Sequence, residues 1–322
     1  MRIRNVLLKM GRIRSYSLSK IMRKLSNRIK RNYDLFLYRH VGKIPKAEVW
    51  QGQWLIYKKI KKKYLDVHYD LKTLFPKNKS IPDEKNIWVY WNDDIELAPD
   101  LVKKCYKQLQ KNKPENYRLI LISQQNIQEY IHFPSFIMDK VERKIMSQAH
   151  FADIIRTALL YKYGGIWMDA TCLLTSKIPE KVLNSDFFVF QATLLDVYSP
   201  IKNSNWFIVA NKRNCRILER MLQVLLFYWE KNNHILHYFL YHIIMSTIVE
   251  TDSECYKIWK KMPYICNMNP HVMQYSFYDE FSEVQWNNII ESCFVHKLTY
   301  KYDNKALSTT KKNILQHVMD VY

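Results

Sequence analysis

The sequence predicts an α/β fold containing a Rossmann-like unit, preceded by a basic helical extension. Two apolar segments with strand propensity, Asn86–Trp91 and Tyr117–Ser123, flank a stretch from Pro99 to about Asn112 that suits a helix. Strand, helix and strand at this spacing form one Rossmann-like unit. Residues 147–174 then pass from helical periodicity through a glycine pair into a short apolar strand. The net charge of +20 is concentrated in residues 1–63.

The N-terminal extension is basic and amphipathic. Residues 1–63 carry 19 Lys and Arg against only Asp34 and Glu48, a net charge of +17, so the remaining chain is nearly neutral. Apolar residues recur there at spacings of three and four, which is typical of a helix with one apolar face. Such a helix favours a membrane surface or a partner, and the alternative is a helix that docks on the rest of the protein. Loop residues near position 80 predict a division into an extension, 1–80, and a main domain, 81–322.

Composition excludes several classes of protein. A hydrophobic content of 48% indicates a folded core and argues against disorder. The six dispersed cysteines predict neither a zinc site nor a disulfide framework, and we expect buried thiols in a reducing cytosol. No signal peptide is evident, and the most apolar run, Ile235–Val249, is too short to span a membrane. No nucleic-acid-binding motif accompanies the basic charge.

The stretch around which the chain is organised reads SQAHFADIIRTALLYKYGGIWMDATCLL, from Ser147 to Leu174. An apolar helical stripe includes Ile154 and Leu159, while Asp153 and Arg156 lie three apart on another face. Gly164 and Gly165 are expected to end the helix, because glycine accepts the backbone conformation of a C-terminal cap. A strand over Ile166–Met168 then ends on Asp169.

This arrangement favours a nucleotide diphosphate ligand, because ligands of open α/β sheets lie beyond the carboxyl ends of the strands. Asp169 would face a divalent cation or a ribose, and Arg156 would contact a second anionic or hydroxyl group. The alternative is a solvated Asp/Arg pair on a helix, followed by a carboxylate in a turn.

Further elements are expected downstream. Strands are predicted at Phe187–Gln191 and Asn205–Ala210, a helix from Asn214 to Trp229, and helical structure over residues 233–262. The histidines of this last segment do not form a tight ligand set, so core or surface positions are expected for them. Asn269–His271 is read as a loop on the acceptor side.

The motif ADIIR…YKYGGIWMDAT resembles the nucleotide-sugar site of GT-A glycosyltransferases of the family 32 type. Among these it is most similar to bacterial capsular polysaccharide synthesis proteins, and large clostridial glucosylating toxins share the core. The resemblance covers roughly residues 85–302. It implies a mixed, mostly parallel sheet with helices on both faces, and reaction with retention of anomeric configuration. The chain departs from the D-x-D pattern at Thr171, where the family has a second Asp that often binds metal.

The resemblance also implies roles for individual residues. Asp169 and Arg156 would be catalytic. The remaining donor-binding residues would be Tyr90, Trp91 and Asn92 near the base, then Asp153, Gly165, Thr171, Asn205, Lys297 and Lys301. Asn205 has an equally good alternative as a turn or cap residue. In the segment HKLTYK, His296 would join Asp169 as a metal ligand in place of the missing carboxylate, and Lys297 or Lys301 would neutralise phosphate.

The function implied is a glycosyltransferase that moves a sugar from a nucleotide-diphosphate sugar to a surface glycan: capsular polysaccharide, O-antigen or a related lipid-linked oligosaccharide. A divalent cation, Mn²⁺ or Mg²⁺, would assist. The enzyme would be cytoplasmic and peripheral at the inner face of the cytoplasmic membrane, with residues 1–63 on anionic lipid. The alternatives are a toxin-like protein glycosyltransferase and a non-enzymatic basic scaffold or nucleic-acid-binding protein.

Overall fold

The computed structural model describes residues 48–76, 85–193 and 199–322. The chain divides into two compact units, residues 1–52 and 53–322, and the second contains the fold described below. Most of the basic extension, and the boundary expected near residue 80, lie outside the described residues. Within the described residues no helix is long and apolar enough to cross a membrane.

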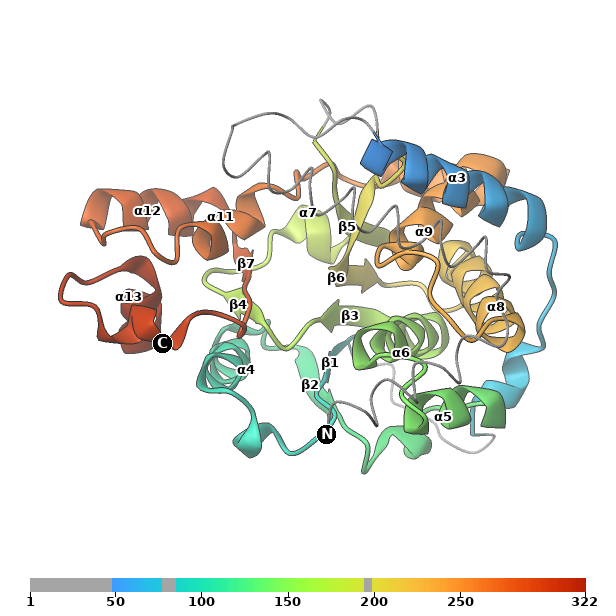
Figure 1. Cartoon of the computed structure of the whole chain (residues 1–322), viewed down its shortest axis with the longest axis horizontal. Helices are drawn as coiled ribbons and strands as arrows, with labels where there is room; N and C mark the ends of the chain where they lie inside the picture. The colour runs from blue at the N-terminus through green and yellow to red at the C-terminus, as the bar shows by residue number, and fades with distance from the viewer. Residues whose placement is uncertain (1–47, 77–84, 194–198) are drawn as a thin grey trace, which may run out of the picture. The chain divides into compact units, whose positions relative to one another are not determined.

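A five-stranded sheet in the order β2-β1-β3-β6-β5 forms the centre of the main unit (Figure 1). Its strands are β1 Lys85–Tyr90, β2 Tyr117–Ile122, β3 Gly165–Met168, β5 Phe187–Gln191 and β6 Asn203–Ala210. β1 pairs in parallel with both β2 and β3, whereas β6 is antiparallel to its neighbours β3 and β5. Four of the five strands therefore run the same way, and the predicted mixed, mostly parallel sheet is confirmed.

Helices lie on both sides of this sheet. The chain passes from β1 to β2 through α4 (Asp100–Asn112), then returns over β1 to β3 through α5 (Ser135–Glu142) and α6 (Gln148–Tyr163). Because crossovers between parallel strands are right-handed, this reversal of direction sends α4 and α6 to opposite faces. Figure 1 shows α4 on one side of β1 and α6 on the other. The α/β prediction is thus confirmed.

The helix α6 is buried nearly all round, which explains its sequence. Ser147 caps its N-terminus, and α6 packs against β1, β3 and β6 as well as α8 (Arg216–Lys231). A helix enclosed in this way is apolar on every face rather than amphipathic. Asp153 and Arg156 of this helix are only 5% and 4% exposed, so they are not a solvated surface pair.

The glycine pair closes α6 and lets β3 approach β1. The Gly164 N–H donates to the carbonyl of Leu160, and Gly164 and Gly165 have φ of 70° and 100°. A Cβ on Gly165 would lie 2.3 Å from the carbonyl oxygen of Asn86 in β1. Glycine is therefore required at position 165 for both conformation and space.

Around this centre lie α3 (Glu48–Lys63), α7 (Glu180–Leu183), α9 (Leu240–Thr251) and α10 (Ser253–Lys261), with the 3₁₀ helices η2 (Leu71–Leu74), η3 (Ile95–Leu97) and η4 (Ile127–Glu129). The helical prediction over 233–262 is wrong for its first part, because residues 232–239 are irregular. There the Tyr228 hydroxyl donates to the His234 carbonyl and accepts from the Leu236 N–H, which replaces helical hydrogen bonds.

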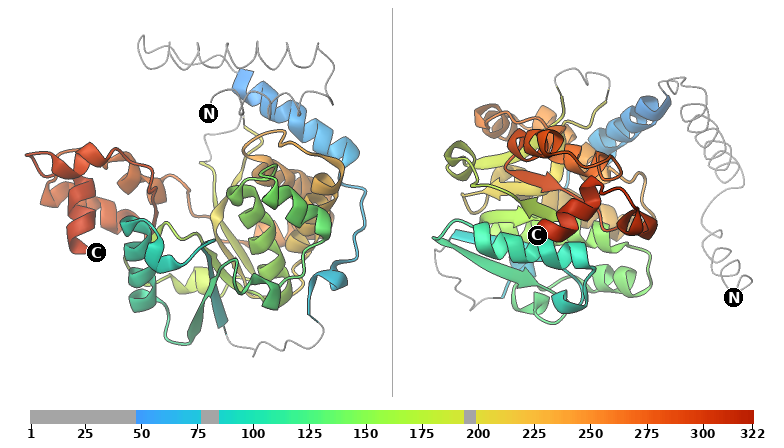
Figure 2. Two further views of the ribbon diagram at one scale, coloured as in Figure 1. Left: turned by 60° about the horizontal axis from the view of Figure 1, so that its bottom comes forward. Right: turned by 90° about the vertical axis from the view of Figure 1, so that its left-hand side faces the viewer.

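The C-terminal part has a small sheet and a core of its own. β4 (Cys172–Leu174) pairs antiparallel with β7 (Val295–Lys297). The helices α11 (Asn269–Tyr275), α12 (Glu283–Ser292), η5 (Asn304–Ser308) and α13 (Ile314–Val321) surround a second apolar cluster that includes Phe277 and Leu315. The loop expected at Asn269–His271 is wrong, because these residues form the first turn of α11. Figure 2 shows these red helices gathered beside the sheet and close to α4, which contributes Leu101 to the cluster.

Residues 53–76 belong to the main unit. Ile60 in α3 is fully buried, and the Ser199 hydroxyl donates to the Gln53 side chain over 2.8 Å. Further along, the His132 N–H donates to the Leu74 carbonyl. All six cysteines are free and five of them are buried, as expected.

Candidate functional site

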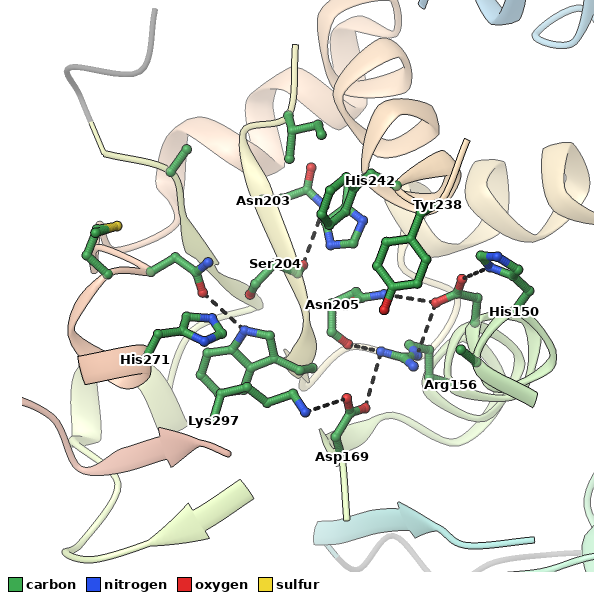
Figure 3. A pocket seen from close by; sticks show the side chains of 18 of the residues that line it. His150, Arg156, Asp169, Asn203, Ser204, Asn205, Tyr238, His242, His271 and Lys297 are labelled. Carbon is green, nitrogen blue, oxygen red and sulfur yellow. Dashed lines mark hydrogen bonds and ion pairs between the residues drawn. The ribbon is translucent and has the colours of Figure 1, made fainter. Parts of the chain in front are cut away.

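A cavity of about 430 Å³ lies at the carboxyl edge of the sheet, beyond β3 (Figure 3). Its charged and polar lining residues are His150, Asp153, Arg156, Asp169, Thr193, Asn203, Ser204, Asn205, His242, Asn267, His271 and Lys297. Its apolar and aromatic lining residues are Ala149, Ala192, Ile201, Trp206, Tyr238, Phe239 and Met268.

The topology brings these side chains together from distant parts of the sequence. Asp169 directly follows β3, and because β6 is antiparallel to β3, Asn203–Asn205 at the start of β6 lie at the same edge. The helix α6 ends beside the first residue of β3, so its N-terminal half reaches this edge as well. Lys297 arrives through β7, where it pairs with Cys172 of β4.

Arg156 is the buried centre of the site. Its Nη1 lies 3.3 Å from Asp169 Oδ1 and also donates to the carbonyl of Asn205, while its Nε donates to the carbonyl of Ala152. The guanidinium stacks over the Trp167 ring, 5.0 Å from the ring centre. Burial by itself would lower the pKa of Arg156, but the charges of Asp169 and Asp153 outweigh it and the pKa is raised. Arg156 is therefore a permanent buried cation with a fixed orientation.

Asp153 contacts Arg156, Asn205 of β6 and His150 of its own helix. Its Oδ1 accepts from the Asn205 amide at 2.9 Å and lies 3.6 Å from Arg156 Nε, and its Oδ2 lies 3.4 Å from His150 Nδ1. Asn205 is thus held inside β6 by both a side-chain and a backbone contact, and the alternative that it is a turn or cap residue is wrong. His150 was not expected from the sequence, although its spacing of three from Asp153 on one helix could have indicated it.

Asp169 lies between two cations. Arg156 contacts its Oδ1 and Lys297 Nζ lies 3.5 Å from its Oδ2, from opposite sides in Figure 3. The Trp167 indole N–H also donates to Oδ1 over 2.9 Å and fixes the carboxylate. Lys297 donates in addition to the hydroxyl of Thr171, the residue that replaces the second Asp of D-x-D. The four ionised groups Asp153, Arg156, Asp169 and Lys297 sum to zero charge.

The walls of the cavity are neutral and partly aromatic. Burial lowers the pKa of His242 to about 4, and burial together with the charge of Lys297 lowers the pKa of His271 to about 4. Both rings are therefore uncharged at pH 7. The Trp206 indole donates to Asn267 over 3.1 Å, and Ser204 Oγ and His242 Nδ1 have no hydrogen-bond partner among the described residues.

The described residues do not fit a dedicated divalent-cation site. Within them no three His, Cys, Asp or Glu side chains converge as metal ligands, and both oxygens of Asp169 already face protein cations. His296 is fully buried and does not line the cavity. Because successive residues of a strand point to opposite faces, His296 faces away from the side on which Lys297 meets Asp169.

Several residues expected at the donor site lie outside the cavity lining: Tyr90, Trp91, Asn92, Gly165, Thr171, His296 and Lys301. The Tyr90 hydroxyl lies 3.0 Å from the side-chain oxygens of both Asn92 and Gln148, and Trp91 packs edge-on to Tyr300. Gly165 lies at the opposite end of β3 from Asp169, where its role is the close approach to β1. Lys301 is exposed. A role for Tyr90, Trp91 and Asn92 at the base stays a prediction.

Residues 44–318 match the family model described as capsular polysaccharide synthesis protein. Two curated fungal proteins are similar over shorter regions. One is named Probable glycosyltransferase FCK3, from Fusarium pseudograminearum, with 24% identity over 48% of this chain and 42% of its own length. The other is O-glycosyltransferase PaGT from Phomopsis amygdali, with 26% identity over 32% of this chain and 27% of its own length. The chain thus matches less than half the length of each relative.

Among solved structures, the PaToxG glycosyltransferase matches 77% of this chain and 95% of its own, with 11% identity and a TM-score of 0.35.

Proposed function

Because the chain belongs to the family of capsular polysaccharide synthesis proteins, we propose that it is a glycosyltransferase. In this proposal the donor is a nucleotide-diphosphate sugar and the acceptor is a surface glycan or its lipid-linked precursor. The observation that carries it is the pair of cations, Arg156 and Lys297, that meet on Asp169 in the floor of a cavity at the carboxyl edge of the sheet.

The chemistry of these groups suits glycosyl transfer. Negative charge grows on the departing diphosphate during the reaction. Positively charged side chains fixed at that point stabilise the transition state more than they stabilise the bound nucleotide sugar. Lys297 is the more accessible of the two cations, with a side chain 20% exposed against 5% for Arg156. Lys297 would therefore contact the phosphates, while Arg156 holds Asp153 and Asp169 in place.

The remaining lining suits a sugar. Asp153, Ser204 and Asn205 line the cavity with carboxylate, hydroxyl and amide groups, the kinds of group that bind sugar hydroxyls. Trp206 and Tyr238 provide aromatic surface against which the apolar face of a sugar ring packs. Retention of anomeric configuration, the GT-A assignment to family 32 and a bacterial source follow from the sequence resemblance and form part of the proposal. The anomer formed can be identified by NMR of the product.

The proposal includes a membrane location for the acceptor. Residues 1–63 carry a net charge of +17, and Lys58 and Lys61–Lys63 on the described helix α3 are exposed. Basic segments bind anionic lipid with about 1 kcal/mol for each Lys or Arg at the surface. A peripheral enzyme at the cytoplasmic face of the membrane would reach a lipid-linked acceptor in this way.

The test is a panel of nucleotide sugars, each assayed for thermal stabilisation and for slow release of nucleoside diphosphate. A donor at 100 times its dissociation constant stabilises the native state by about 2.7 kcal/mol, which is visible as a rise in melting temperature. We expect one base and one sugar to stand out, and the response to disappear in Asp169→Asn. Asp139→Asn is the matched control, because Asp139 is exposed and its ion pair is with Arg143, the residue just after its own helix. Absence of any nucleotide-sugar response from a folded protein would refute the proposal.

A further inference from the structure

Lys297 Nζ lies among oxygen atoms in the manner of a bound cation. It donates to Thr171 Oγ1, lies 3.4 Å from the carbonyl oxygen of Leu298 and 3.5 Å from Asp169 Oδ2. An ammonium has three donors, and here three oxygens of different chemistry surround it: a hydroxyl, a carbonyl and a carboxylate. Hard divalent cations select ligand sets of the same kind.

The backbone fixes this position. Lys297 pairs with Cys172 in the β4–β7 ladder, and the Leu298 N–H donates to the carbonyl of Thr171 over 2.9 Å. The lysine is therefore delivered next to the first and third positions of the sequence Asp169-Ala170-Thr171, which corresponds to D-x-D. Thr171 is 7% exposed, and its hydroxyl is engaged by the ammonium.

A divalent cation at Asp169 would be unfavourable beside these groups. Arg156 and Lys297 already face the two oxygens of Asp169, so an added ion would meet two positive charges. The other carboxylate of the site, Asp153, already contacts Arg156, His150 and Asn205. A diphosphate, in contrast, is negatively charged and is attracted by both cations.

We propose that the Lys297 ammonium takes the place of the divalent cation, so that this site binds the diphosphate of its donor without metal. The inference rests on the proposed function and narrows it: Thr171, at the position of the second Asp of D-x-D, is the hydrogen-bond partner of the lysine. It makes a reciprocal prediction, that restoring the carboxylate and removing the lysine creates a metal-dependent site.

The experiment measures binding of UDP, GDP and ADP by calorimetry, each in excess EDTA and in excess Mn²⁺. For the nucleotide that binds, we expect the dissociation constant of the wild-type protein to differ by less than about threefold between the two conditions. Lys297→Gln should weaken binding by roughly tenfold or more in both, as for loss of a charge-assisted hydrogen bond. Lys297→Arg keeps the charge and should retain metal-free binding. The double variant Thr171→Asp, Lys297→Ala should bind in Mn²⁺ and lose binding in EDTA.

The control is Lys305→Gln, which removes one charge from an exposed lysine of η5 and should bind like the wild-type protein. Melting temperatures show whether each variant is folded. Wild-type binding that requires Mn²⁺ and disappears in EDTA would overturn the inference and leave the glycosyltransferase proposal standing. Failure of every nucleotide in both conditions would refute the proposed function and the inference with it. Unchanged binding by folded Lys297→Gln would also overturn the inference.

Discussion

Replacement of His296 by leucine should make the protein less sensitive to acid. His296 is fully buried in β7, neither ring nitrogen has a hydrogen-bond partner among the described residues, and burial lowers its pKa from 6.5 to about 4. Between pH 6.5 and 4, His296 is therefore mostly protonated in the unfolded chain and mostly neutral in the folded chain. Stability contributed by the neutral ring is complete above about pH 7.5 and is lost progressively as the pH falls from 6.5 to about 4.

The size of this pH-dependent loss of stability follows from the lowered pKa of His296. At pH 5 the unfolded histidine is about 1.5 pH units below its pKa, which corresponds to about 2 kcal/mol lost relative to pH 8. The free energy of unfolding should therefore decline between pH 8 and pH 5 by about 2 kcal/mol more in the wild-type protein than in His296→Leu. His242 and His271 contribute similar slopes to both proteins, so the difference between the two isolates His296.

The assay is urea unfolding at pH 8, 7, 6 and 5, followed by fluorescence. His132→Gln serves as control, because His132 is exposed, and it should follow the wild-type slope. Parallel slopes for wild-type and His296→Leu would refute a buried, neutral His296. The leucine variant should also bind the donor with an unchanged response to Mn²⁺; a higher Mn²⁺ requirement would instead support the role as metal ligand that the sequence resemblance implies.

Three further predictions concern the cavity and the extension. Asp169→Asn should reduce donor turnover by about a hundredfold or more, as for lost transition-state electrostatics, and near-normal turnover would remove Asp169 from the site. Arg156→Lys should bind donor more weakly than the wild-type protein, because an ammonium cannot reproduce the contacts of the guanidinium to Asp169 and two backbone carbonyls. Normal binding by that variant would contradict the geometry. The full-length protein should pellet with anionic vesicles and be released by high salt. A chain lacking residues 1–52, which carry a net charge of +12, should pellet to a much smaller extent, because it keeps only the lysines of residues 53–63, and should still hydrolyse donor. Equal sedimentation of both proteins would exclude a role of residues 1–52 in lipid binding.

Local patterns in the sequence predicted the central elements well, because those elements satisfy local rules. The glycine pair ends α6 and begins β3, and the segments around Trp88 and Leu119 are strands. The pairing of β4 with β7 was not predictable from any local pattern, since the two strands are three residues each and lie more than 120 residues apart.

The candidate site was predicted in part for the same reason. Asp153, Arg156 and Asp169 lie within one motif, so spacing alone indicated that they meet. His150 and Asn203 reach the cavity through helix burial and the reversed direction of β6, which depend on tertiary packing. Side-chain direction on β7 decided between His296 and Lys297, and alternation along a strand could not be assigned before the pairing partner was known.

The late arrival of Lys297 has a consequence for biosynthesis. Its partner Asp169 lies 128 positions earlier, so a growing chain that has already paired β1, β2 and β3 still lacks one of the two cations around that carboxylate. Domains that fold during translation do so as their segments emerge from the ribosome, and contacts between distant positions form last. The group of side chains around Asp169 is therefore complete only after the C-terminal segment has been made.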